Sequence, residues 1–315
     1  MALRIATRVA AFLGSVLVAS ILIFIVTSAL PGDVAQVILG TNADPAAVEA
    51  LRQRHGLDRP LPVQYLDWLF GMFVGDFGHS YLTGQSVISR ISPAIGVTLS
   101  LVLGGMLFAV LFAIPMGMIA AIRRRHASGA LASALSQIGL AIPAFWAGLM
   151  LVYLFAVNLG WLPANGYIRF GNDPGRWARH LVLPVLSLAI VQGSVLSRYV
   201  RSAIIEVLGE DWIRTARAIG WTKWGALIRH GLRNASLSVV TVLGLQLATL
   251  FVGAIVIESV FALPGLGSVL LAAVAQRDLM IVQGTVMLLV LAVLVINALV
   301  DLSYLALDPR LRSRR

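Results

Sequence analysis

Six long runs without Asp, Glu, Lys or Arg dominate the sequence. They cover residues 9–30, 91–122, 127–158, 181–197, 234–257 and 279–300. About 20 consecutive apolar residues suffice for an α-helix to cross the hydrocarbon core of a bilayer. Only 12% of the residues are charged, about half the share usual in soluble proteins. The sequence therefore predicts an all-α integral membrane protein with six transmembrane helices.

Two of these runs have an alternative interpretation. The first run has 22 residues and follows Arg4 and Arg8, whereas the apolar core of a cleaved signal peptide has about 7 to 15 residues. We therefore predict that the first run is retained as a span. The fourth run is the shortest and contains Pro184 and Gln192, so a re-entrant segment is its alternative.

The distribution of charge predicts the orientation of the spans. With six spans and a cytoplasmic N-terminus, 16 Lys and Arg residues fall in cytoplasmic segments and 8 in outer segments. The acidic residues show the opposite bias, with 5 inside and 9 outside. Because Lys and Arg concentrate in short cytoplasmic loops, this asymmetry predicts that both termini are cytoplasmic and that the fourth run spans the membrane. The net charge of +10 then requires no nucleic-acid partner.

The residues needed for several kinds of chemistry are missing from the sequence. There is no cysteine, and the five histidines lie in different loops, so neither thiolate metal sites nor paired helical histidines are expected. The only lysine, Lys223, stands between Thr222 and Trp224, whereas a phosphate-binding P-loop needs Gly-Lys-Ser or Gly-Lys-Thr. We predict a chain that is no enzyme and holds no cofactor or metal itself.

Ionisable residues inside the spans would indicate a proton or ion pathway. The cores of all six runs contain none, and Glu258 and Asp301 fall at span ends, where the sequence predicts interfacial or capping roles. This pattern disfavours a proton-driven transporter. The chain is therefore expected to be a passive channel or to be driven by another chain.

Two outer segments carry turn signals. In the first, Asp44 and Pro45 predict the start of a short helix over residues 46–55, because Asp caps helices and Pro suits their first position. In the second, Pro264 and Gly265 predict a narrow turn within residues 258–278, followed by an apolar stretch too short to cross a bilayer.

The longest cytoplasmic segment covers residues 198–233. A helix is predicted to end near Gly220, and a second to begin at Trp221 or Thr222. In the second, Trp221, Trp224 and Ile228 recur at helical spacing and form an apolar face. Such a helix either lies on the inner leaflet or docks into a groove of a soluble partner, and the periodicity does not separate the two.

Several motifs resemble one known family. Residues 211–220 read Asp-Trp-Ile-Arg-Thr-Ala-Arg-Ala-Ile-Gly, and characteristic stretches also occur at residues 57–65, 75–80, 258–267 and 297–310. Together they resemble the membrane-spanning permease subunits of binding-protein-dependent ABC importers, in the dipeptide, oligopeptide and nickel branch, and within it the dipeptide permease B-type subunit. The general Glu-Ala-Ala hallmark of these permeases is altered, with Arg214 in place of Glu and Arg233 in place of Pro.

The resemblance implies a type I ABC importer transmembrane fold in the bacterial cytoplasmic membrane. The implied partners are a second homologous permease, two cytoplasmic ATPase subunits that bind ATP and Mg²⁺, and an extracytoplasmic solute-binding protein. Short peptides are the expected cargo, with nickel or another small solute such as haem as alternatives within the family. A secondary transporter or channel is the alternative outside it.

The resemblance also divides the chain and assigns candidate residues. The expected domains are residues 1–93 (first span and outer loop), 94–305 (transmembrane domain with a coupling segment at 198–233) and 306–315 (basic cytoplasmic tail). The residues expected to couple to the ATPase are Asp211, Arg214, Thr215, Ala216, Arg217, Gly220, Trp221, Trp224 and Ile228. Those expected near the binding protein are Phe261, Pro264, Gly265, Leu266 and Gly267.

Overall fold

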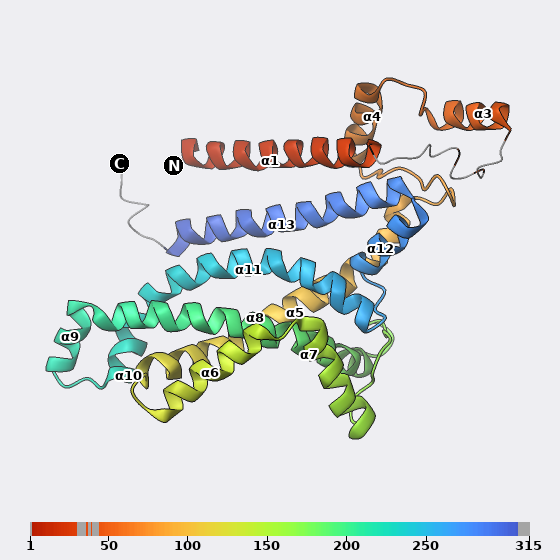
Figure 1. Cartoon of the computed structure of the whole chain (residues 1–315). Helices are drawn as coiled ribbons and strands as arrows, with labels where there is room; N and C mark the ends of the chain where they lie inside the picture. Colours follow the sequence, from red (N-terminus) through yellow and green to blue (C-terminus); the bar gives the residue numbers. More distant parts are fainter. Residues whose placement is uncertain (1, 30–35, 37–38, 40–43, 308–315) are drawn as a thin grey trace. The chain divides into compact units, whose positions relative to one another are not determined.

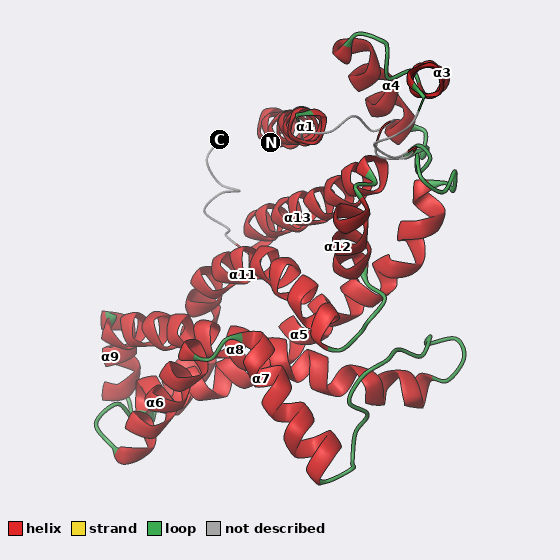
Figure 2. Cartoon of the chain, turned by 45° about the vertical axis from the view of Figure 1, so that its right-hand side comes forward, coloured by secondary structure: helices red, strands yellow, loops and turns green. Residues whose placement is uncertain are grey.

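The computed structural model describes residues 2–29, 36, 39 and 44–307. In this part of the chain the regular structure is helical, apart from one isolated antiparallel bridge between His79 and Ser86 (Figure 2). The all-α prediction is confirmed. Residues 308–315 of the predicted tail (306–315) lie outside the described residues, as does the side chain of Asp301. The predicted domain boundaries stay predictions.

Five helices in the described residues are long and apolar enough to cross a membrane. They are α1 (Ala2–Ser28), α5 (Val87–Ile122), α8 (Pro174–Gly209), α11 (Leu232–Val260) and α13 (Leu279–Leu307). The fourth predicted run is the middle of α8, which has 36 residues and is long enough to span. Asp173 caps this helix by accepting a hydrogen bond from the Arg176 N–H at 2.9 Å.

The third predicted run is not one straight helix. It divides into α6 (Ala127–Ala141) and α7 (Ala144–Leu151), which continues as a π-helix over Val152–Asn158. The two parts are bent by 102°. Pro143 explains the break, because the residue before proline is driven out of the helical region, and Ile142 is extended at φ −90° and ψ 122°. Counting this bent pair as one span gives the predicted six.

The chain forms two compact units. The first comprises residues 1–97 and 264–295, with α1, α3 (Pro45–His55), α4 (Leu61–Phe73), the start of α5, α12 (Leu266–Gln276) and most of α13. The predicted cap of α3 is present, since Asp44 accepts from the Ala46 N–H at 3.1 Å. The sequence did not predict α4, whose Trp68 packs with Phe24 and Met287 in a small core.

The second unit comprises residues 98–263 and 296–315, and α8 is its central helix. It packs against α6, α7 and α11, and Figure 1 shows α8 and α11 side by side. Small residues allow this close approach. Ser197 of α8 donates to Ser136 of α6 at 2.7 Å, and a Cβ on Gly139 would lie 2.1 Å from the Ser194 hydroxyl oxygen.

The predicted orientation can be tested with two exposed positions. Because the native chain has no cysteine, Thr222→Cys and Asn172→Cys would each carry a single thiol at an exposed site. In intact cells we expect an impermeant thiol reagent added outside to label Asn172→Cys and to leave Thr222→Cys unlabelled until the cells are lysed. Labelling of Thr222→Cys in intact cells would contradict the orientation.

Candidate functional site

The first half of the predicted coupling segment is the helix α9 (Asp211–Ala218), which packs on α8. Its Ile213 and Ala216 are buried in a core that also contains Ile204 and Val207 of α8. The polar residues of α9 lie on the other side and are exposed: Asp211, Arg214, Thr215 and Arg217. Of the predicted coupling residues on this helix, Ala216 therefore holds α9 on α8 and the others are available to a partner.

Gly220 forms the turn after α9. Its φ is +103°, a value that glycine adopts without steric cost. The Trp221 N–H bonds the Ala216 carbonyl at 3.2 Å, which is the six-to-one contact of a Schellman helix end. The predicted helix end is confirmed, and this glycine determines the direction in which the chain leaves α9.

The second half of the segment is short and irregular. Thr222 caps α10 (Lys223–Ala226) by accepting from the Gly225 N–H at 3.1 Å. A π-helical turn over Leu227–Gly231 then leads into α11. Ala226 and Leu227 are fully buried in the same core as Ile213, so both halves of the segment are attached to α8.

The predicted apolar face of Trp221, Trp224 and Ile228 is divided between core and surface. Trp224 is half-buried and packs against the core. Trp221 is 39% exposed and Ile228 57%, and Ile219, which the sequence analysis did not single out, is 74% exposed. The Arg229 guanidinium lies 5.5 Å from the centre of a Trp221 ring. We call Ile219, Trp221, Ile228 and Arg229 the coupling surface, a name taken from the role predicted for this segment.

The predicted outer turn is mostly buried. Phe261, Gly265, Leu266 and Gly267 are buried, whereas Pro264 is exposed. Phe261 is held from two directions, since its carbonyl accepts from the Gly166 N–H at 3.1 Å and its ring would lie 3.1 Å from a Cβ on Gly148. Of the five residues expected near the binding protein, only Pro264 is exposed to a partner.

Glu258 corrects an expectation from the sequence. We expected an interfacial or capping role at the end of the fifth span, but the residue is completely buried near the end of α11. Thr98 of α5 donates a hydrogen bond to its Oε1 at 2.5 Å. The carboxyl group therefore lies inside the second unit, where it connects α5 to α11.

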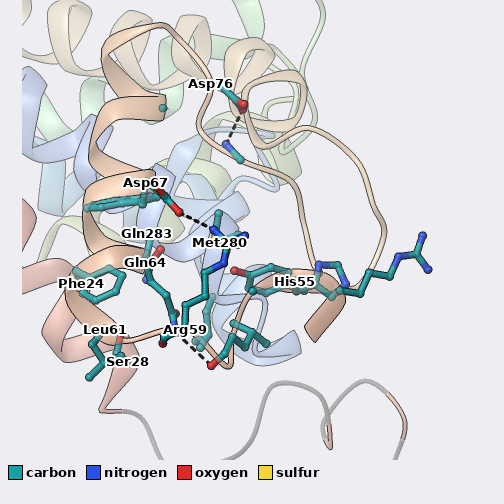
Figure 3. Close-up of a pocket in the computed structure, with 18 of the residues that line it drawn as sticks. Phe24, Ser28, His55, Arg59, Leu61, Gln64, Asp67, Asp76, Met280 and Gln283 are labelled. Carbon is teal, nitrogen blue, oxygen red and sulfur yellow. Dashed lines mark hydrogen bonds and ion pairs between the residues drawn. The ribbon is translucent and has the colours of Figure 1, made fainter. Parts of the chain in front are cut away.

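The first unit contains a cavity of about 480 Å³ between α1, α3, α4 and the start of α13 (Figure 3). Two of the polar side chains that line it, Arg59 and Gln64, bond to groups of α4 and of the turn between α3 and α4. The Arg59 guanidinium bonds the Asp67 carboxylate at 3.1 Å, and the Gln64 amide donates to the carbonyls of Arg59 and Leu57. These contacts fasten the turn between α3 and α4.

Tyr81 also lines this cavity. Burial, and secondarily the negative charge of Asp278, raise the pKa of the Tyr81 phenol above its ordinary value of 10.0. The hydroxyl therefore remains protonated at neutral pH and can act as a hydrogen-bond donor. Its ring contacts the His55 ring edge-on, with centroids 4.9 Å apart.

Comparison with solved structures identifies the transmembrane fold. The fold resembles a crystallised amino acid ABC transporter, with a TM-score of 0.51 and 17% identity over 67% of this chain and 90% of that one. It also resembles the MetNI methionine ABC transporter, with a TM-score of 0.56 and 19% identity over 70% of this chain and 97% of that one. The chain thus has the transmembrane fold of an ABC transporter.

Sequence comparison gives the family. The model of the binding-protein-dependent transport system inner membrane component matches residues 113–313, and the N-terminal model of such membrane components matches residues 1–102. A peptide transport system permease protein of Brucella abortus (strain 2308) is 41% identical, and the glutathione permease GsiC of Salmonella typhimurium (strain LT2) is 38% identical. Each alignment covers 97% of both chains. This chain belongs to the inner membrane components of binding-protein-dependent transport systems and is a multi-pass permease.

Proposed function

We propose that this permease forms one half of the translocation pore of an ATP-driven importer for short peptides. A second, homologous permease supplies the other half, two cytoplasmic ATPase subunits supply the energy, and an extracytoplasmic solute-binding protein delivers the cargo. The observation that carries the choice of cargo is the 41% identity, over nearly the whole chain, to a peptide transport permease.

The glutathione permease adds weight to this assignment. Glutathione is a tripeptide, so the two kinds of relative share a cargo with peptide-type amides and terminal charges. A nickel chelate or haem lacks that common chemistry. Short peptides are therefore the cargo class that accounts for both likenesses.

The coupling surface supports a separate source of energy. Ile219 and Trp221, in the turn between α9 and α10, and Ile228, in the π-helical turn, expose apolar side chains on a segment packed on α8. Exposed apolar side chains of this kind fit a groove on a soluble partner. The chain's single lysine, Lys223, follows Thr222 at the start of α10 and lacks the glycine that precedes the lysine of a P-loop. We propose that ATP and Mg²⁺ bind to the partner subunits.

Uptake by the reconstituted importer tests the proposal. The proteoliposomes contain this permease, its partner permease and the ATPase subunits, with ATP inside and the binding protein outside. Labelled tri-alanine, glutathione, nickel chelate or haem is then added outside. We expect uptake of a peptide that depends on both ATP and binding protein. Uptake without the ATPase would favour a secondary transporter or channel, and uptake of nickel or haem alone would contradict the cargo.

A further inference from the structure

Three polar side chains form a hydrogen-bonded cluster between α8 and α11. The Gln246 side-chain amide donates to Gln192 Oε1 at 2.7 Å, and the Gln192 side-chain amide donates to Thr249 Oγ1 at 3.2 Å. The Thr249 hydroxyl donates to the main-chain carbonyl of Gln246 at 2.9 Å. All three residues belong to the second unit. We call them the amide cluster.

The amide cluster lies deep within the spans. Gln246 and Thr249 fall in the middle part of the candidate span Val239–Val260, and Gln192 lies near the middle of Pro174–Gly209. Polar groups at this depth are unfavourable against lipid unless they are bonded or face water. The position of the cluster therefore needs a physical explanation.

Exposure separates this cluster from the polar pairs that merely join helices. Ser136 and Ser197, which bond across α6 and α8, are buried, as expected for a packing contact. In the amide cluster, by contrast, Thr249 is exposed and both glutamines are only half-buried. Neighbouring side chains on the same exposed side of α11, Leu245 and Val252, are apolar. The cluster is therefore a polar spot that lies beside exposed apolar side chains.

We propose that the amide cluster lines the translocation pathway and hydrogen-bonds the main chain of a peptide in transit. This inference rests on the proposed function. A glutamine side chain offers the same C=O and N–H groups as a peptide bond. Each Gln Nε2 carries two N–H donors, and among the described residues each makes one hydrogen bond, within the cluster, so that a second N–H can bond a ligand. Such contacts hold a peptide irrespective of its side chains.

Access of water to the cluster tests the pathway directly. In the complete importer in lipid nanodiscs during ATP hydrolysis, Thr249→Cys is treated with a charged methanethiosulfonate reagent. The matched control is Leu103→Cys on α5, since Leu103 is apolar and 60% exposed. Because the thiolate is the reactive form and apolar surroundings suppress it, we expect Thr249→Cys to react at least about tenfold faster. Equally slow reaction of both would overturn the proposal and indicate contact with lipid or with the partner permease.

A second measurement tests contact with the peptide. For Gln246→Leu we expect ATP-driven uptake of tri-alanine or glutathione to fall about fivefold to tenfold, since a hydrogen bond is lost, and Gln246→Asn to restore part of it. Uptake by Gln246→Leu at the wild-type rate would overturn the contact. If the wild-type importer takes up no peptide, the proposed function fails and the peptide contact fails with it, whereas labelling of Thr249→Cys still decides whether the cluster lines the pathway.

Discussion

Replacement of Ile228 by aspartate is expected to remove the ATPase subunits from the purified importer while leaving the permease folded. The same replacement at the adjacent Leu227 is expected to prevent folding. Ile228 is exposed on the coupling surface, whereas Leu227 is completely buried in a core that also contains Ile204 and Val207 of α8. An unpaired buried charge costs about 3–5 kcal/mol, and loss of a central interface side chain about 2 kcal/mol or more of binding.

The two variants are compared by size-exclusion chromatography of the detergent-solubilised permease and by co-purification of the ATPase. We expect Ile228→Asp to elute as the wild type does but without ATPase, and Leu227→Asp to yield little folded protein. A full complement of ATPase on Ile228→Asp, with weaker binding to anionic lipid, would instead support a helix lying on the membrane surface. The variant Trp224→Asp distinguishes loss of ATPase binding from loss of folding less clearly, because Trp224 is packed partly into the core.

The coupling segment shows what periodicity alone can and cannot predict. The apolar character of the segment and its glycine turn were correctly predicted, but an α-helical period placed Trp221, Trp224 and Ile228 on one face. The structure has a π-helical turn from Leu227 onward. Trp221 precedes the N-cap of α10 and is therefore not on that helix, and at the start of the π-helical turn Leu227 is buried whereas Ile228 is exposed.

The spans, too, have features that the sequence predicts and features that only the structure shows. Uncharged runs predicted the helices because a bilayer requires long apolar segments with satisfied backbone groups. The bend after α6 had a local signal, Pro143, that a count of apolar residues ignores. The burial of Glu258 had none, because its partner Thr98 is 160 residues away and only the packing of α5 against α11 brings them together.

The outer turn needed the structure for another reason. Its proline and glycines predicted a turn, and α12 does begin at Leu266, yet sequence gives no indication of which side of a turn is covered. Leu266 belongs to the core of the first unit. Charged replacements there would therefore report on folding, and Pro264 is the position at which contact with a binding protein can be tested.

Replacement of Gly220 by valine is expected to uncouple ATP hydrolysis from transport or to weaken co-purification of the ATPase. Apart from Gly220 itself and its two chain neighbours, no described heavy atom lies within 4 Å of a Cβ built on Gly220, so a Cβ at this position meets open space. The cost comes from the backbone, because a β-branched residue at φ +103° is strained by about 1–3 kcal/mol. Relief of that strain would redirect the chain between α9 and α10 and displace Trp221 from the coupling surface.

Gly209→Val is the matched control. A Cβ on Gly209 also meets open space, but Gly209 ends α8 without a positive φ. The control should therefore add the same side chain with little backbone strain. We expect Gly209→Val to retain ATPase and peptide uptake near wild-type levels, and Gly220→Val to lose uptake while ATP hydrolysis continues or the ATPase dissociates. Equal, normal transport by both variants would show that the turn at Gly220 does not set the position of the coupling surface.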